Sequence, residues 1–303
     1  MKIAVSGSTG LIGSPLVEVL KARGDAVVRL VRPPAKAGPD SIQWDPERGR
    51  IDRAGLEAVD AVIHLAGENV FGRWSSAKKR RIRDSRVQGT RLISDTIASL
   101  AKRPATLLAA SAIGFYGNQR DQPLTEQSPS GSDFLAEVAR EWEAATASAA
   151  RAGVRVVNMR FGVVLTPRGG ALGKMLPPFR LGVGGPVGSG NQFVSWIALE
   201  DAINAIVYLL GKTEVTGPVN ITAPNPVTNR EMATTLGRVL HRPSVVPVPS
   251  FALKMAFGAE GADMLQSGQR VLPERLVASG FTFRFPALEP ALRHLLAPSD
   301  TAP

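Results

Sequence analysis

The sequence contains no cysteine, and its three histidines (His64, His241 and His294) lie far apart along the chain. The lack of cysteine excludes disulfide bonds, thiol catalysis and metal sites built from thiolates. Isolated histidines do not supply the clustered ligands of a zinc site. We therefore expect no metal centre.

The sequence also lacks a long apolar run. No stretch of about 18 consecutive apolar residues occurs, so we expect no segment that crosses a membrane. The first predicted strand begins directly after Met1, which leaves no room for a signal or transit peptide. These features predict a soluble, cytoplasmic protein.

Aromatic residues make up only 6% of the chain, whereas the net charge is +10. A strongly basic balance can indicate nucleic-acid binding. Part of the excess, however, is concentrated in residues 78–86, and no nucleic-acid-binding motif is present. Binding of anionic small molecules, or solubility alone, explains the charge more simply. We expect a small-molecule substrate, and neither a nucleic-acid nor a membrane partner.

The most informative residues that are present are three glycines between a strand and a helix. Residues 2–5 predict a short buried strand and residues 14–23 a helix, with Gly7, Gly10 and Gly13 between them. Such a turn brings backbone N–H groups and the positive end of the helix against a phosphate. The strand–turn–helix context predicts a dinucleotide site. The expected contacts in this turn are Gly7, Ser8, Thr9, Gly10, Leu11, Ile12 and Gly13.

Arg32 follows the second predicted strand, residues 25–31, where a dinucleotide fold contacts the adenosine ribose. An acidic residue there would accept a hydrogen bond from the 2′-hydroxyl of NAD. Arginine cannot accept it, but pairs well with a 2′-phosphate. The sequence therefore favours NADP over NAD, with a solvated surface arginine as the alternative.

Strands and helices continue to alternate along the chain, which predicts an α/β fold. Residues 33–55 look like a loop, and His64 is expected to be a packed core residue. Further strands are predicted at residues 60–65, 106–110, 154–160 and 215–222. Helices are predicted at residues 76–101, 134–150, 172–181, 200–211, 229–240 and 251–269.

Residues at the carboxyl ends of the strands should meet at one edge of the sheet, where a cofactor lies. The small residues that close the third strand leave space for it. The cofactor contacts expected at this edge are Leu65, Ala66, Gly67, Glu68, Ser111 and Phe161.

Arg86 lies on the predicted inward stripe of the helix at residues 76–101. Burying a bare charge is costly, so this arginine needs an anionic partner. A cofactor phosphate and a protein carboxylate both satisfy that need, and the sequence leaves the choice open. The other lysines and arginines of residues 78–86 are expected to form a solvated face.

Motifs are spread over nearly the whole chain: SGSTGLIG at residues 6–13, HLAGEN at 64–69, REWEAA at 140–145, RFGVVL at 160–165 and GVGGPVGSGNQFVSWIALEDA at 182–202. Together they resemble those of an extended short-chain dehydrogenase/reductase of the NAD-dependent epimerase/dehydratase group. More narrowly, they resemble the atypical epimerase-like subfamily of SDR39U1 and YfcH type. The resemblance implies NADP binding, but no defined substrate.

The resemblance also implies a Rossmann-type, doubly wound parallel sheet with a smaller C-terminal region on the substrate side. On this basis residues 1–165 should form the NADP-binding core. Residues 166–244 should form a mixed segment with a lid loop at 182–190, and residues 245–295 a small C-terminal domain. Phe193 and Trp196 could line a pocket, although packing is the commoner use of both.

One departure from the family pattern concerns catalysis. Extended reductases and epimerases use a Tyr-x-x-x-Lys pair with a nearby Ser or Thr, in which the lysine lowers the tyrosine pKa. The corresponding helix here, FLAEVAREWEAATASAA, has neither tyrosine nor lysine, and the third position is Ala112. The catalytic residues are therefore unknown.

A literal Tyr-x-x-x-Lys occurs at Tyr208 and Lys212, at the end of another predicted helix, and we do not expect it to be catalytic. Tyr116, Glu68, Asn69 and Ser111 border the expected crevice and are the remaining candidates. Two functions stay open. The first is an NADP(H)-dependent oxidoreductase or epimerase acting on a small carbonyl or hydroxyl compound. The second is a non-catalytic NADPH-sensing or scaffolding protein.

Overall fold

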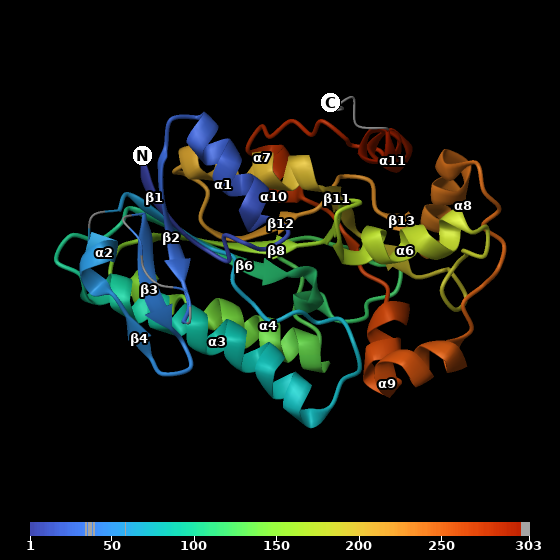
Figure 1. Cartoon of the computed structure of the whole chain (residues 1–303), viewed down its shortest axis with the longest axis horizontal. Helices are drawn as coiled ribbons and strands as arrows, with labels where there is room; N and C mark the ends of the chain where they lie inside the picture. Colours follow the sequence, from blue (N-terminus) through green and yellow to red (C-terminus); the bar gives the residue numbers. More distant parts are fainter. Residues whose placement is uncertain (34, 36–37, 39, 58, 298–303) are drawn as a thin grey trace.

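A computed structural model describes residues 1–33, 35, 38, 40–57 and 59–297 of the chain. Its centre is an eight-stranded sheet in the order β12-β8-β6-β5-β1-β2-β3-β4, parallel except for the β3–β4 pair (Figure 1). The strands are β1 (Lys2–Ser6), β2 (Ala26–Val31), β3 (Ser41–Asp45), β4 (Arg50–Ile51), β5 (Ala61–His64), β6 (Thr106–Ala112), β8 (Arg155–Phe161) and β12 (Gly217–Ile221).

Helices cover both faces of this sheet, which confirms the predicted doubly wound fold (Figure 1). On one face lie α1 (Gly13–Ala22), α7 (Leu199–Gly211) and α10 (Glu274–Ala278). On the other lie α2 (Arg53–Glu57), α3 (Ser76–Ser99), α4 (Phe134–Ala144) and α5 (Ala147–Arg151).

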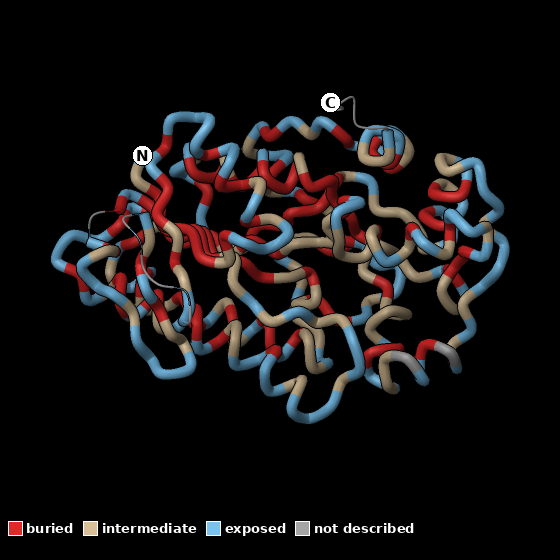
Figure 2. The backbone as a smooth tube through the Cα atoms, in the orientation of Figure 1, coloured by how far each residue is buried: buried red, intermediate tan, exposed pale blue. Residues whose placement is uncertain are grey.

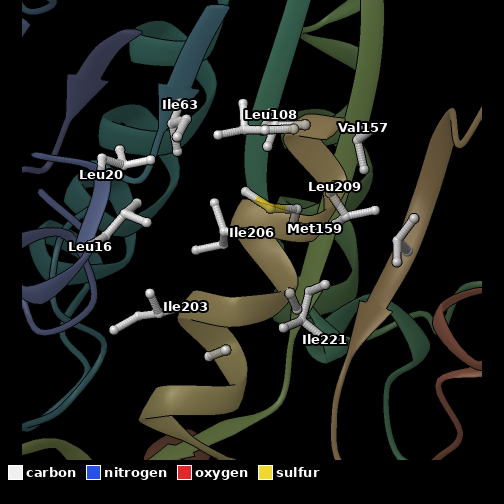
Figure 3. Close-up of a cluster of buried hydrophobic side chains, with 14 of the residues drawn as sticks. Leu16, Leu20, Ile63, Leu108, Val157, Met159, Ile203, Ile206, Leu209 and Ile221 are labelled. Atoms are coloured by element: carbon white, nitrogen blue, oxygen red, sulfur yellow. The ribbon is translucent and has the colours of Figure 1, made fainter. Parts of the chain in front are cut away.

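The buried residues are concentrated in the central strands and in the helices beside them (Figure 2), and their side chains form an apolar cluster on each face of the sheet. Figure 3 shows the layer under α1 and α7, where leucines and isoleucines of both helices pack on side chains from the central strands. Alternate strand residues point to the opposite layer, as strand geometry requires. Burial on both faces explains why these strands read as continuous apolar runs.

The prediction of a loop over residues 33–55 was wrong in part. This segment contains β3, β4 and α2, and β3 extends the parallel sheet beside β2. Ile42 and Trp44 alternate along β3 and are both buried in the core beneath α2 and α3. The short alternating pattern was hidden by the proline- and glycine-rich residues that flank it.

The predicted helix at 134–150 is divided into α4 and α5, because Ala145 and Thr146 separate them. The predicted helix at 229–240 is α8 (Asn229–Leu240), and its N-cap is Thr228. The Thr228 side chain accepts from the Glu231 N–H while Glu231 accepts from Thr228, which forms a capping box.

The second half of the chain is interwoven with the first. The additional elements are β7 (Pro123–Leu124), β9 (Val163–Leu165), α6 (Gly170–Arg180), β10 (Phe193–Val194), β11 (Trp196–Ala198), β13 (Val227–Thr228), α9 (Ser250–Gln266), β14 (Arg270–Val271) and α11 (Leu288–Leu296). β14 pairs with β7 and β11 with β9, so late strands complete sheets begun by early ones. No helix in the described part of the chain is long and apolar enough to cross a membrane.

The predicted lid loop at residues 182–190 is bound to the segment before α9. The Gly188 N–H donates to the Val248 carbonyl at 3.0 Å, and the Val248 N–H donates to the Pro186 carbonyl at 2.8 Å. The Val187 N–H donates to Asn229 Oδ1 at 2.7 Å. The loop is therefore held by hydrogen bonds to the segment before α9 and to the start of α8.

Candidate dinucleotide site

The glycine turn between β1 and α1 is so close to its surroundings that two of its glycines cannot carry a side chain. Gly7 has φ +67°, and a Cβ there would lie 2.8 Å from the Leu65 carbonyl carbon. A Cβ on Gly13 would lie 2.1 Å from the Gly7 oxygen. Gly10 has more space, with the same oxygen 3.2 Å from its Cβ position. The turn thus packs on the end of β5 with little room for substitution.

The N-terminus of α1 has no side-chain cap, since Ile12 occupies the N-cap position and makes no capping hydrogen bond. Its first N–H groups are left for solvent or an anionic ligand. Thr9, Gly10 and Leu11 are exposed above them, and Ser8 is buried. This arrangement fits the phosphate cradle predicted from the sequence.

Apolar residues from three elements meet beside this turn. Ile12, Leu65 and Phe161 are half-buried and pack on the same core cluster. Ala66 and Gly67 continue from Leu65 along the carboxyl edge of the sheet. The structure therefore brings the glycine turn and the ends of β5 and β8 together, as predicted.

The Ser6 hydroxyl holds the ends of β1 and β5 together beneath the turn. It lies 3.2 Å from the Leu65 nitrogen and 3.4 Å from the Ala66 nitrogen, both of which donate to it. The same oxygen is 2.5 Å from His64 Nδ1. His64 is fully buried, as predicted, and desolvation lowers its pKa to about 4. It is therefore neutral near pH 7.

Arg86 lies beneath Gly67, with its guanidinium carbon 3.4 Å from the position of a Cβ on that glycine. The guanidinium donates to the carbonyl oxygens of Glu68 and Ile82, at 3.0 and 3.1 Å, and lies over the Trp142 ring. No carboxylate among the described residues forms an ion pair with it. Burial lowers its pKa to about 10. The charge of Glu68 opposes part of this shift, so of the two partners that the sequence left open the structure supplies a nearby carboxylate but no direct ion pair among the described residues.

The other basic residues of α3 are largely neutralised by carboxylates. Lys78 and Arg81 pair with Glu68, at 2.8 and 3.7 Å. Lys79 pairs with Glu260 and Arg83 with Glu141. The predicted solvated face is thus an array of ion pairs, which reduces the positive field that nucleic acid would require.

Glu68 is unsuited to act as a general base. The hydrogen bond from Lys78 is the main reason that the pKa of Glu68 lies below its ordinary value. A glutamate that acts as a general base near neutral pH needs a raised pKa. Glu68 instead pairs with Lys78 and Arg81.

Arg32 is exposed directly after β2, the strand that lies between β1 and β3 in the sheet. Since β2 neighbours β1 in the parallel sheet, Arg32 lies at the same edge as the glycine turn. This is the position expected for a residue that contacts the adenosine ribose.

Comparison with known proteins identifies the family. The family model described as "NAD dependent epimerase/dehydratase family" matches residues 3–222. The chain belongs to that family. A second family model, "Domain of unknown function (DUF1731)", matches residues 248–295.

Full-length relatives agree with this assignment. The epimerase family protein Mb2239 of Mycobacterium bovis is 43% identical over 291 residues, covering 96% of each chain. The human epimerase family protein SDR39U1 is 38% identical over 301 residues, covering 98% of this chain and all of its own. A crystal structure of human SDR39U1 (isoform 2) with NADPH superimposes with a TM-score of 0.88 and 37% identity, covering 97% of this chain and 99% of that one.

The α4 helix of this epimerase-family chain contains neither tyrosine nor lysine. The buried side chains of α4 are Ala136, Val138, Ala139 and Trp142. Leu135, at the start of α4, faces the turn after β6, where its Cβ lies 3.3 Å from the Cβ position of Gly114. The helix therefore presents no phenol or ammonium group to the crevice.

Tyr116 was expected to border the crevice, and the structure corrects this. It ends the 3₁₀ turn Ile113–Tyr116, which directs its ring into the core, and it is fully buried. Its hydroxyl donates to Asn220 Oδ1 at 2.7 Å and accepts from Arg160 at 3.0 Å. Burial raises the pKa of Tyr116 above its ordinary value.

Ser111 belongs to the same buried polar cluster. Its hydroxyl donates to Glu143 at 2.7 Å, and Arg160 donates to both oxygens of Glu143, at 2.7 and 2.8 Å. The Ser111 side chain is therefore not directed at a substrate. Sequence reasoning missed the Arg160–Glu143 pair; the local signal was the charged Arg160 between the apolar residues Met159 and Phe161 at the end of β8.

The literal Tyr-x-x-x-Lys match lies at the opposite edge of the sheet. Arg155, the first residue of β8, donates to the carbonyls of Leu209 and Lys212, so the end of α7 adjoins the start of that strand. The Tyr208 hydroxyl donates to the Ser279 carbonyl, and Lys212 pairs with Glu214.

Trp196, one of the two aromatic residues considered for lining a pocket, is completely buried in the core.

Proposed function

We propose that this protein binds NADP(H) in the crevice formed by the glycine turn and the ends of β5 and β8. The observation that carries the proposal is Arg86, a largely buried cation beneath Gly67 without a carboxylate partner among the described residues. An anionic group in the crevice would neutralise it. The proposed contacts are Gly7, Ser8, Thr9, Gly10, Leu11, Ile12, Gly13, Arg32, Leu65, Ala66, Gly67, Glu68, Arg86, Ser111 and Phe161.

The preference for NADP(H) over NAD(H) rests on Arg32. Its exposed guanidinium at the end of β2 suits a 2′-phosphate, which it can bind through two parallel N–H donors. The presence of NADPH in the human relative's structure supports this choice. Calorimetric titration of the purified protein with NADPH and NADH tests it. Failure of both to bind would overturn the proposal.

We further propose that the bound cofactor reduces or oxidises a small carbonyl or hydroxyl compound. The nicotinamide supplies or accepts the hydride in such chemistry. With neither tyrosine nor lysine in α4, and with Ala112 at the third position, the proton has to come from water or from a group on the substrate side. Oxidation of NADPH by a panel of aldehydes, ketones and sugar nucleotides is the direct test.

A second candidate function is NADPH sensing or scaffolding without turnover. The specific observation in its favour is that Ser111 and Tyr116 are both hydrogen-bonded inside the protein. Under this alternative NADPH binds and shifts the melting temperature, yet no compound in the panel causes its oxidation. The two candidates share the cofactor site and differ only in turnover.

A further inference from the structure

α6 contacts the glycine turn at its start and the segment after β5 one turn later. A Cβ on Gly169 or Gly170, at its start, would lie 3.2 Å from the Leu11 side chain of the glycine turn. One turn later, Lys174 Nζ stands 5.2 Å from the ring centroid of Phe71, in the segment after β5. Lys174 and Phe71 therefore lie against each other, one helical turn from the contact of α6 with the glycine turn.

The backbone around Phe71 is held in a defined turn. The Phe71 N–H donates to Asn69 Oδ1 at 2.9 Å, and Gly72 adopts φ +106°, a conformation that favours glycine. The Trp74 indole N–H donates to the Val70 carbonyl at 2.8 Å. The ring is thus presented on a fixed support, which reduces the entropic cost of using it for binding.

Lys79 provides an internal comparison for Lys174. Lys79 Nζ lies 4.5 Å from the ring centroid of Phe134 and forms an ion pair with Glu260 Oε2 at 2.8 Å. Lys174 has the aromatic ring but no carboxylate partner among the residues that the structure describes. Lys79 therefore contacts both an aromatic ring and a carboxylate, whereas Lys174 contacts an aromatic ring alone among the described residues.

We propose that Lys174 and Phe71 anchor an anionic group of the substrate, a carboxylate or a phosphate monoester next to an apolar or aromatic plane. The inference rests on the proposed function, because it assigns the anchor to the substrate of the same crevice. The ammonium group supplies a compact charge with rotatable donors, and the ring supplies a face for the adjacent plane. Sequence reasoning could not find Lys174, because an exposed helical lysine resembles any solvated residue.

The test measures binding of small probes by calorimetry, with and without saturating NADP⁺. Benzoate and phenyl phosphate carry the two possible anions on an aromatic ring, and benzamide is the uncharged match for benzoate. The variants are Lys174→Gln, Lys174→Arg and Phe71→Leu. Lys102→Gln is the matched control, because Lys102 is an exposed lysine just before β6, at the sheet edge opposite the crevice.

We expect one of the two anions to bind the wild-type protein, and Lys174→Gln to weaken it about tenfold or more. Lys174→Arg should restore binding to within about threefold, and Phe71→Leu should weaken it severalfold. Benzamide should bind at least about tenfold more weakly than benzoate if the anion is a carboxylate. Lys102→Gln should bind like the wild type.

The proposal is overturned if neither anion binds the wild-type protein at millimolar concentration, or if Lys174→Gln binds the anion as well as the wild type does. The titration with NADPH separates this failure from that of the proposed function. If NADPH binds and the anions do not, only the anchor is wrong. If an anion binds in a way that depends on Lys174 but NADPH does not bind, the proposed anion site is retained and the proposed cofactor site is wrong.

Discussion

The guanidinium of Arg86 lies directly beneath Gly67, 3.4 Å from where a side chain on that glycine would begin. A larger residue at position 67 would press on this cation, which forms no ion pair with a described carboxylate and is only partly compensated by the charge of Glu68. Its counter-ion is therefore expected to come from outside the chain.

Replacing Arg86 by glutamine should weaken NADPH binding about tenfold or more, since a hydrogen bond to a charged group is worth roughly 1.5–3 kcal/mol. Stability without cofactor should change little, because removing a poorly neutralised buried charge offsets the lost hydrogen bonds. Arg83→Gln is the matched control on the same helix, since Arg83 pairs with Glu141 at the surface. Equal NADPH affinity in the two variants would show that Arg86 does not contact the cofactor.

Arg32 should determine the choice between the two dinucleotides. We expect NADPH to bind the wild-type protein more tightly than NADH by roughly 1.5–3 kcal/mol. Arg32→Asp should remove or reverse this preference, because a carboxylate repels the 2′-phosphate and accepts from a 2′-hydroxyl. Paired calorimetric titrations measure it, and equal wild-type affinities for both cofactors would refute the assignment.

His64 should make the protein less stable as the pH falls. Its pKa is lowered to about 4 in the folded state, against 6.5 ordinarily, so between these values the unfolded chain binds more protons. The free energy of unfolding should therefore fall on acidification through this range, by up to about 3 kcal/mol from this residue.

The measurement is chemical denaturation of the wild type, His64→Gln and the exposed control His241→Asn at pH 7.0 and 4.5. His64→Gln should be less stable at pH 7 but should lose less stability on acidification. His241 adopts a left-handed conformation that asparagine tolerates, so the control should follow the wild type. A wild-type pH dependence retained in His64→Gln would assign the effect to other groups.

The Tyr208 and Lys212 pair should have no role in cofactor binding. Tyr208→Phe combined with Lys212→Ala should leave NADPH affinity, and any turnover, within about twofold of the wild type. The reason is their position at the edge of the sheet opposite the crevice. A tenfold loss of turnover in a folded double variant would contradict that placement.

Tyr116→Phe should affect stability rather than chemistry. The change leaves Asn220 without a donor in a buried site and should cost roughly 1–3 kcal/mol of unfolding free energy. For any substrate that the NADPH-oxidation panel identifies, kcat should be nearly unchanged. A true acid or base would lower kcat by about 10²–10⁴-fold with NADPH affinity intact. That result for Tyr116→Phe would make Tyr116 a candidate acid or base again. The same measurement on Glu68→Gln and Ser111→Ala tests those two residues.

The sequence by itself determined the doubly wound α/β fold and the glycine turn. Strand and helix periodicity are local properties, and the positions of Gly7 and Gly13 follow from the short connection between β1 and α1. The absence of tyrosine and lysine from α4 was equally visible, because it required only the place of that helix in the chain order. The alternating Ile42 and Trp44 of β3 show the limit of this approach, since so short a pattern cannot be separated from loop.

Only the tertiary structure decided which polar side chains are available for function. Whether Arg86 meets a carboxylate, whether Tyr116 points into the core, and whether Lys174 reaches Phe71 all depend on contacts between segments far apart in sequence. A local sequence pattern predicts the helix or strand on which such a residue lies. It does not predict which charged or apolar side chains from other segments will contact that residue. Burial and pairing set the pKa and accessibility of each group, and both arise from packing of the whole chain.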